Sequence, residues 1–465
     1  MTWKRPIAIA LMTLSPQVSL AFCGTYVGTQ DSETSNEASR IVVARDGDDI
    51  VLTMANDYQG DLAEFGLLIP VPPTVTLNGV SVVSEDALNE LDLYTGPRLV
   101  TYTEEEVREG VTQTNTRWVD GEQSEGVSSG CGGSGSSRGG SGGYQTTTTS
   151  TSTETSTELG DQSFDDVVVE DMATKGGYQL ALLSAENGAS LAQWASGHGL
   201  TIDPATADVL DDYIDGGASF VAAQVTLDAL QNGVLWLPPL QVRYQSPVVS
   251  LPIRLGTTSS AGVQEMLVFT LNSAFEGWTG ISNYGEAPIQ SECLYSGDDF
   301  SAFYQDRYRE ALAPEVTGVS DDTYDTAGPV EDLSATWLVE YGWGSGKCDP
   351  CTDEDQLGLD EDTVWRLGWT RGINDVFVTR IRMRFAPEEI GQDLVLYSSY
   401  VPFNSQLRYI QDAPYLDGVF PTCEQGLRRA RQADGVVSAS HLAGLGTATG
   451  LFMFLGLTVF RRRDL

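Results

Sequence analysis

The chain has 465 residues, of which 41% are hydrophobic, and its 65 acidic residues outnumber 26 basic ones to give a net charge of -39. This length is enough for a large buried core, and for two packed units. The negative surface repels nucleic-acid phosphates and anionic lipid head groups, so the composition argues against either as a partner. A salty habitat and an ordinary solubilising surface explain the acidity about equally well.

Residues 1–21 have the organisation of a cleavable signal peptide. Lys4 and Arg5 form a short positive region, an apolar stretch follows, and Ser19 and Ala21 supply the small residues that signal peptidase requires before the cut. We therefore expect the chain to be exported and the mature protein to begin at the next residue.

Residues 22–103 are expected to form the first part of the exported body. Two apolar runs, Ile41–Val43 and Ile50–Met54, flank a polar turn that contains glycine, and so predict a β-hairpin. Phe65–Val71 is a further short apolar run that prolines end. Ser84 and the two acidic residues behind it predict the start of a helix.

Residues 104–163 differ in composition from everything around them. The stretch opens with three glutamates, is nearly all Gly and Ser between Gly126 and Gly143, and is almost unbroken Thr and Ser from Thr146 to Glu158. Such a composition cannot bury enough apolar surface to offset the conformational entropy lost on folding. We predict a disordered insertion that is dispensable for folding.

Residues 164–423 are expected to form the main part of the body. Asp203 as N-cap, Pro204 in the first turn and Gly216 past the end bracket a helix. The strand candidates are Tyr178–Leu183, Phe220–Leu227, Val234–Tyr244, Val248–Leu255, Met266–Leu271 and Val376–Phe385, and a second helix is predicted over Asp299–Ala313. The fold class predicted for the body is α+β, a strand-rich mixed fold with several short helices.

The end of the chain adds one predicted C-terminal transmembrane helix to this fold. Residues 424–441 form a polar linker, and residues 442–460 carry no charge and would rise about 28 Å as a helix, close to the thickness of a bilayer core. Residues 461–465 begin with three arginines. Because the body is expected outside, this arginine tail is expected in the cytoplasm. A buried core helix is the alternative, and proteolytic processing of the tail stays open.

All six cysteines lie in the region expected to be exported, where an even number favours disulfides without fixing their connectivity. The predicted disulfide cysteines are Cys23, Cys293, Cys348, Cys351 and Cys423, and the sixth, Cys131, lies in the insertion. Cys348-Asp349-Pro350-Cys351 also has the spacing of a thiol-redox site, because a CxxC at a helix N-terminus lowers the thiol pKa. No βαβ context surrounds it, so a structural crosslink is the preferred interpretation.

Motifs for catalysis and metal binding are weak. His198 is the one histidine far from the predicted anchor, and we expect it at an exposed helix C-terminus rather than in a catalytic site. Asp353-Glu354-Asp355 and Asp360-Glu361-Asp362 offer the carboxylates that calcium prefers, but the EF-hand ligand order and glycine are absent. A solvated acidic loop is therefore preferred over a calcium site, and no cofactor motif is complete.

Several short segments together resemble a known family over roughly residues 22 to 410. They are Phe22-Cys23-Gly24, Met54–Asp61, Ile69-Pro70-Val71-Pro72, Arg98-Leu99-Val100, Leu183-Ser184-Ala185, Leu237-Pro238-Pro239-Leu240, Leu251–Gly256, Trp337, Tyr341, Trp343, Cys348-Asp349-Pro350-Cys351 and Thr379-Arg380. The set is similar to an uncharacterised bacterial family, domain of unknown function 2330. The resemblance implies a secreted or surface protein, often with a terminal anchor, and supplies no activity, ligand or catalytic residue.

These observations predict a single-pass, membrane-anchored protein of the bacterial envelope or surface, with its N-terminal body outside the cytoplasm. Its acidic ectodomain is predicted to be a non-enzymatic binding or structural protein with an envelope protein or polymer as partner. The alternative is an exported enzyme, either a carboxylate-based hydrolase or a thiol oxidoreductase that uses Cys348 and Cys351. A pocket in which two acids converge beside aromatic side chains would favour the enzyme, and a filled core with flat acidic faces would favour binding.

Overall fold

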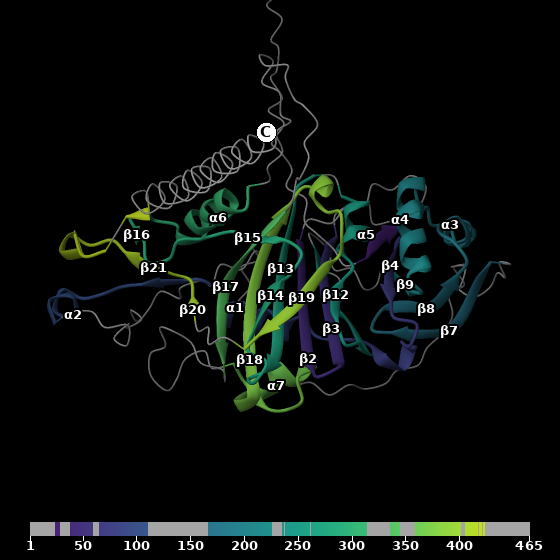
Figure 1. The fold of residues 1–465 in the computed structure, drawn as a ribbon, viewed down its shortest axis with the longest axis horizontal. Helices are drawn as coiled ribbons and strands as arrows, with labels where there is room; N and C mark the ends of the chain where they lie inside the picture. The colour runs from purple at the N-terminus through teal and green to yellow at the C-terminus, as the bar shows by residue number, and fades with distance from the viewer. Residues whose placement is uncertain are drawn as a thin grey trace, which may run out of the picture.

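The computed structural model describes residues 24–27, 38–58, 65–109, 166–225, 235–236, 238–260, 262–313, 335–344, 359–400, 405–416, 418–420 and 422–423. These residues form a strand-rich α+β fold, as the sequence predicts. Two layers of β-sheet pack face to face, and helices cover their outer sides (Figure 1).

A ten-stranded sheet forms one of the two layers. β2 (Ala38–Asp46) and β3 (Asp49–Tyr58) make the predicted hairpin, and β2 also pairs in parallel with β13 (Gln264–Ser273). The other neighbour of β13 is the antiparallel strand β18 (Val376–Phe385). The remaining strands are β17 (Thr336–Gly344), β15 (Gly285–Glu286), β11 (Leu240–Gln245), β5 (Val80–Val82), β10 (Leu235–Trp236) and β20 (Ser405–Gln406).

Two smaller sheets form the second layer. The five-stranded sheet has the order β1-β4-β9-β8-β7, and the three-stranded sheet has the order β12-β19-β14. Their strands are β1 (Thr25–Val27), β4 (Phe65–Val71), β9 (Ser219–Val225), β8 (Tyr178–Ala185), β7 (Val167–Lys175), β12 (Val249–Leu251), β19 (Leu394–Ser399) and β14 (Trp278–Ile281). Ile41 and Val268 of the large sheet pack in one core with Ile69 of the five-stranded sheet and Leu396 of the three-stranded sheet. This core joins the two layers.

Helices cover the outer faces of the ten-stranded and five-stranded sheets. α1 (Asp86–Thr95) and α7 (Glu361–Arg366) pack on the ten-stranded sheet, and α3 (Gly188–Gly197) and α4 (Pro204–Asp215) cover the five-stranded sheet. The short helices are α5 (Ile253–Thr257), η1 (Leu77–Gly79), η3 (Ile373–Asp375), η4 (Pro387–Glu389) and η5 (Pro414–Leu416).

A third small sheet extends from one end of the fold (Figure 1). It contains β6 (Arg98–Val100), β21 (Arg408–Gln411) and β16 (Leu294–Tyr295), all paired in parallel. α2 (Glu104–Glu109) and α6 (Phe300–Ala311) belong to the same end of the molecule.

Most of the predicted elements are confirmed. Phe65–Val71 and Val376–Phe385 form β4 and β18 over the predicted residues. α4 begins after Asp203, whose side chain accepts a hydrogen bond from the Thr206 N–H at 3.0 Å. α6 begins after Asp299, which caps it in the same way through Ala302. The predicted turn and cap chemistry therefore sets these boundaries.

Two strand predictions are wrong because prolines interrupt them. Val248–Leu255 contains β12 and then turns into helix α5 after Pro252, and Val234–Tyr244 divides into β10 and β11 around consecutive prolines. Proline has no N–H to donate to a strand neighbour, so the ladder stops there.

The predicted insertion begins too early. Glu104–Glu109 is helical because Thr103 and Glu106 form a capping box, in which the Thr103 N–H donates to the Glu106 carboxylate at 2.6 Å. Residues 110–165 lie outside the described residues, as do the predicted signal peptide (1–21), linker (424–441), membrane segment (442–460) and arginine tail (461–465). No helix within the described part of the chain has the length and apolar character needed to cross a membrane.

Candidate functional site

A group of buried charges lies on the helix-covered face of the ten-stranded sheet. In β18 the odd-numbered side chains, such as Ile381, enter the core between the two layers. Strand alternation therefore turns Arg380, Arg382 and Arg384 to the opposite face. Arg380 and Arg382 are fully buried there, so each guanidinium needs a partner.

Glu340 on β17 is the centre of this charge network. Its carboxylate accepts hydrogen bonds from Arg380 and Arg382, and from the Tyr304 hydroxyl at 2.6 Å. Burial opposes the ionisation of Glu340, but the two guanidinium groups outweigh it and lower the pKa to about 2. Glu340 is therefore a fixed anion at neutral pH and does not have the pKa of a general acid or base.

Two further carboxylates balance the arginines. Asp92 on α1 accepts a hydrogen bond from Arg380 at 2.5 Å. Glu265 on β13 accepts one from the Tyr308 hydroxyl at 2.7 Å and one from Arg309 at 3.0 Å, and both donors lie on α6. The network thus connects α1 and α6 to the sheet, and its carboxylates are occupied by partners within the fold.

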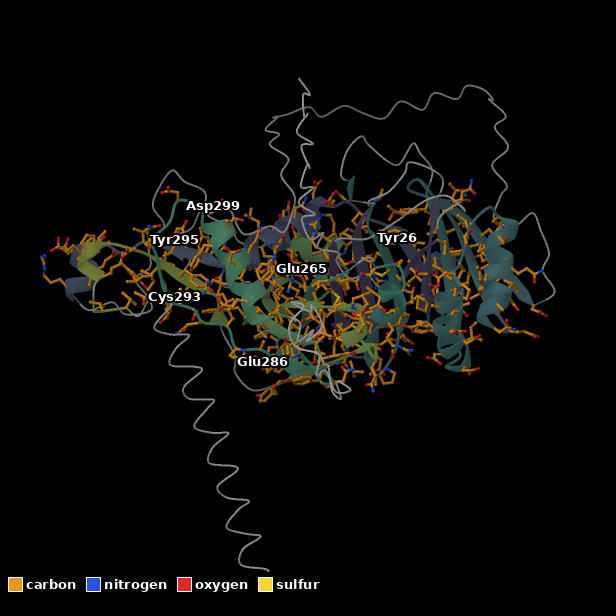
Figure 2. The ribbon with its side chains drawn as sticks, turned by 90° about the horizontal axis from the view of Figure 1, so that it is seen from above. Tyr26, Glu265, Glu286, Cys293, Tyr295 and Asp299 are labelled. Atoms are coloured by element: carbon orange, nitrogen blue, oxygen red, sulfur yellow. The ribbon has the colours of Figure 1, made fainter. Side chains whose placement is uncertain are left out.

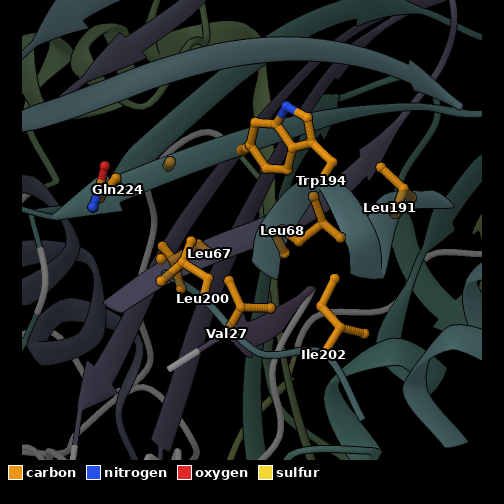
Figure 3. A pocket seen from close by; sticks show the side chains of 12 residues that line it. Val27, Leu67, Leu68, Leu191, Trp194, Leu200, Ile202 and Gln224 are labelled. Carbon is orange, nitrogen blue, oxygen red and sulfur yellow. The ribbon is translucent and has the colours of Figure 1, made fainter. Parts of the chain in front are cut away.

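An apolar pocket lies between the five-stranded sheet and α3 (Figure 3). It measures about 300 Å³ including its mouth, and Val27, Leu68, Leu200 and Trp194 are among its lining residues. The buried Trp194 indole N–H has no hydrogen-bond partner among the described residues, and in Figure 3 it points away from the apolar side chains. None of the described residues that line this pocket is ionisable, so these residues supply no acid, base or nucleophile.

A second pocket of about 200 Å³ lies between the ten-stranded and three-stranded sheets. Its polar side chains bind one another: Thr270 donates to Thr279 at 2.8 Å, and Asn272 donates to the same hydroxyl at 2.6 Å. No carboxylate lines it either. Neither pocket thus has the paired acids that a carboxylate-based hydrolase requires.

Aromatic side chains gather on the outer face of the three-stranded sheet. In β19, Leu396 points into the core, so its neighbour Tyr397 points outwards and is 39% exposed. The Tyr397 and Trp278 rings meet edge to face, with centroids 5.7 Å apart. Gly280 lies opposite Tyr397 in β14, and a Cβ there would come within 2.7 Å of the tyrosine ring. The missing side chain therefore lets this ring lie against the strand.

Two more exposed aromatic residues lie in the segments next to these strands, Phe275 in the turn before β14 and Tyr400 directly after β19. Phe275 is 74% exposed and Tyr400 is 79% exposed. The turn that carries Phe275 touches the end of β19, because a Cβ on Gly277 would lie 2.3 Å from the Ser399 carbonyl oxygen. We call Phe275, Trp278, Tyr397 and Tyr400 the aromatic face. In Figure 1, β12, β14 and β19 lie towards the viewer, and no helix of the described chain is drawn over them.

The structure describes two of the predicted disulfide cysteines. Cys293 and Cys423 are both buried, belong to the same hydrophobic cluster and are not bonded to each other. Cys23, Cys348 and Cys351 lie outside the described residues, so both the crosslink and the redox interpretation of the CxxC motif stay predictions.

His198 ends α3, as predicted, but the expected exposure is wrong. The side chain is buried, its Nδ1 hydrogen-bonds the Trp194 carbonyl at 2.8 Å, and the two rings lie 4.5 Å apart. Residues four apart on a helix share one face, which explains the stacking.

The second acidic cluster, predicted as a solvated acidic loop, instead begins helix α7. Asp360 caps the helix by accepting from the Thr363 N–H at 2.6 Å, and Asp362 pairs with Arg366 at 2.9 Å. Asp353-Glu354-Asp355 lies outside the described residues. In the described part of the chain, no three His, Cys, Asp or Glu side chains are grouped so that they could hold a metal ion.

Comparison with protein families gives one match. A family described as an uncharacterized protein conserved in bacteria, DUF2330, matches residues 17–397. The chain belongs to the DUF2330 family. The resemblance found in the sequence is thereby confirmed. Neither curated proteins nor solved structures give a match.

The DUF2330 region contains the charge network and three members of the aromatic face. It ends at Tyr397, within β19, so Tyr400, β21 and Cys423 lie beyond it. Neither the charge network nor the aromatic face is predicted by the sequence motifs described above. The alternation of arginines at Arg380 and Arg382 was a visible signal for the network, since charges with period two on a strand must share one face.

Proposed function

We propose that this DUF2330 protein is an exported, membrane-anchored surface protein whose acidic ectodomain binds an uncharged polysaccharide of the cell envelope. The observation that carries the proposal is the aromatic face. Three of its four rings, those of Phe275, Tyr397 and Tyr400, are exposed, and Gly280 leaves Tyr397 room to lie against the three-stranded sheet. Flat rings of this kind pack well against the apolar faces of sugar rings.

The charge of the chain supports an uncharged partner. With a net charge of -39, the protein repels nucleic acids and acidic polysaccharides. A neutral sugar polymer does not meet this repulsion, and its hydroxyl groups can bind the polar side chains that surround the rings.

The distribution of ionisable groups favours binding over catalysis. The strongly shifted Glu340 is enclosed by its arginine partners, and the two pockets have no carboxylate lining. A hydrolase would need two acids that face the same bound sugar, and the described residues of the two pockets do not supply them.

Co-sedimentation with insoluble polymers tests the binding function. The full-length protein should sediment with uncharged probes such as β-glucan or chitin. Replacing Tyr397 and Tyr400 by alanine should weaken this binding about tenfold or more, because central aromatic residues dominate such interfaces. Trp365→Ala is the matched control, since Trp365 is 62% exposed on α7, outside the aromatic face. The proposal would be contradicted if the tyrosine variant bound as strongly as the unchanged protein. It would also be contradicted if the unchanged protein bound no uncharged polymer.

Fractionation tests the proposed anchor. A chain truncated before His441 should be released in soluble form from the cell, while the full-length protein should stay with membranes after a carbonate wash. A truncated protein that remained in the membrane fraction would contradict the anchor.

A further inference from the structure

Cys293 and Cys423 lie on neighbouring backbone segments and in one hydrophobic cluster, although the chain between them forms much of the fold. Their neighbours Leu294 and Thr422 make an isolated parallel bridge, which brings the two backbone segments to strand-pairing distance. The exposed fractions of the two cysteines are only 1% and 8%. Figure 2 shows Cys293 beside Tyr295, towards the end of the molecule that carries the small sheet.

The two cysteine side chains belong to one apolar cluster. The Cys293 sulfur lies 3.9 Å from the carbonyl oxygens of Gln290 and Ser291, and the Cys293 and Cys423 thiols are close enough to shift each other's pKa. Tyr304, Tyr308 and Tyr409 pack in the same cluster and shield the pair from solvent. Two thiols held close together in this way need little rearrangement to join.

We propose that Cys293 and Cys423 form a disulfide that fastens the last described residues of the body to its core. In the cell this bond depends on the proposed export, because it requires an oxidising compartment. The crosslink closes a loop that contains α6, β17, β18, β19, β20 and β21.

The oxidant is a disulfide of another molecule, either a thiol–disulfide oxidoreductase or a small molecule such as oxidised glutathione. The Cys423 thiolate attacks one sulfur of that disulfide, forms a mixed disulfide and releases one thiol. The Cys293 thiol then loses its proton and attacks the Cys423 sulfur, which releases the second thiol. One disulfide forms, one is reduced, and two protons move from the protein to the released thiols.

The surroundings favour this order of attack. The hydrogen bond from Cys293 lowers the pKa of the Cys423 thiol, and the nearby Arg307 guanidinium lowers it further, against the effect of burial. The same hydrogen bond, and then burial, raise the pKa of Cys293. Cys423 is therefore the better nucleophile, and Cys293 is the thiol that completes the bond. Because both sulfurs are buried in the folded chain, the bond forms while the Cys423 segment docks.

Oxidation of the purified full-length protein tests this pairing. The reduced protein is unfolded and then refolded in the presence of oxidised glutathione, so that the oxidant reaches the thiols before the Cys423 segment docks. Remaining thiols are alkylated under denaturing conditions, and the chain is digested without reductant for mass spectrometry. We expect the peptides of Cys293 and Cys423 to be linked, with a mass lower by two hydrogens than the two reduced peptides together. Alkylation of both cysteines, or their linkage to other cysteines, would overturn the proposal.

Two variants sharpen the result. The double variant C348S/C351S is the matched control and should keep the link, whereas loss of the link there would overturn the pairing. C293S should leave Cys423 open to alkylation in the denatured, oxidised protein. Because the oxidation uses purified protein, the link should form even in a chain that the cell does not export, so failed export would contradict the proposed location alone.

Discussion

Arg380 on β18 donates a hydrogen bond to Asp92 on α1 at 2.5 Å, and both side chains are buried. The same guanidinium also reaches the Asp92 carbonyl oxygen at 2.8 Å, so one arginine holds both the side chain and the backbone of the helix. Since Arg380 shares Glu340 with Arg382, the position of α1 depends on charges in the middle of the sheet.

Glu340→Gln should strongly destabilise the fold. The substitution keeps the shape of the side chain but takes the carboxylate partner from the buried Arg382 and leaves Arg380 with Asp92 alone. Breaking a buried ion pair by removing one partner typically costs about 3–5 kcal/mol. Urea unfolding followed by circular dichroism should show a lower midpoint. Glu104→Gln, which removes an exposed pair with Arg108, is the control and should leave the midpoint unchanged. Equal midpoints for Glu340→Gln and the natural protein would contradict the network.

The effect of Glu340→Gln should depend on pH. Because the pKa of Glu340 in the folded protein is about 2, below its ordinary value of 4.5, the carboxylate stabilises the fold fully above about pH 4.5. This contribution, about 3 kcal/mol from the pKa difference, disappears as the pH falls towards 2. The stability difference between the two proteins should therefore shrink in acid. A constant difference between pH 6 and pH 3 would show that Glu340 is not the group responsible.

Gly188→Ala should destabilise the contact between α3 and α4. A Cβ at this position would lie 2.1 Å from the Ala207 carbonyl oxygen, so the two helices have to move apart. Overpacking of this kind costs about 1–3 kcal/mol, measured as a lower unfolding midpoint. Gly391→Ala is the control, since no atom lies within 4 Å of the added carbon. Unchanged stability of Gly188→Ala would mean that the helices are not in this contact.

Gly280→Ala should separate polymer binding from stability. The added methyl group meets only the tip of the Tyr397 ring, which is free to swing outwards, so we expect a stability change below about 1 kcal/mol. Binding to the uncharged polymer should nevertheless weaken, because the ring no longer lies against the sheet. Retained affinity would show that the orientation of Tyr397 is irrelevant to binding.

Local chemistry made the elements of this fold predictable. Alternation over Val376–Phe385 gave a strand with correct ends, and Asp203 with Pro204 gave the start of a helix. Strand alternation and helix capping involve only a few consecutive residues. They can therefore be recognised without knowing which other segments the element packs against. The failure at Val248–Leu255 shows the limit, because an apolar run does not distinguish a strand from a short helix after a proline.

The candidate sites depend on contacts between distant segments and were therefore missed. Asp92 and Arg380 are far apart in the sequence but form an ion pair in the fold. The residues next to each of them give no indication of this pairing. Tyr397 is an ordinary strand residue in the sequence. Only its pairing with Gly280 and its place on an uncovered sheet make it part of a surface. The cysteines were predicted to form disulfides, but the adjacency of Cys293 and Cys423 required the bridge between their neighbours.

The parallel pairing of β2 with β13 also constrains the order in which the protein can fold. Ile41 lies opposite Val268, so the central pair of the ten-stranded sheet joins an early segment to one made much later. During synthesis, the β2–β3 hairpin is finished while β13 has not yet left the ribosome. One edge of β2 stays unpaired throughout this interval, and such edges promote aggregation. The β2–β3 hairpin therefore keeps one unsatisfied strand edge until the chain has been made as far as β13.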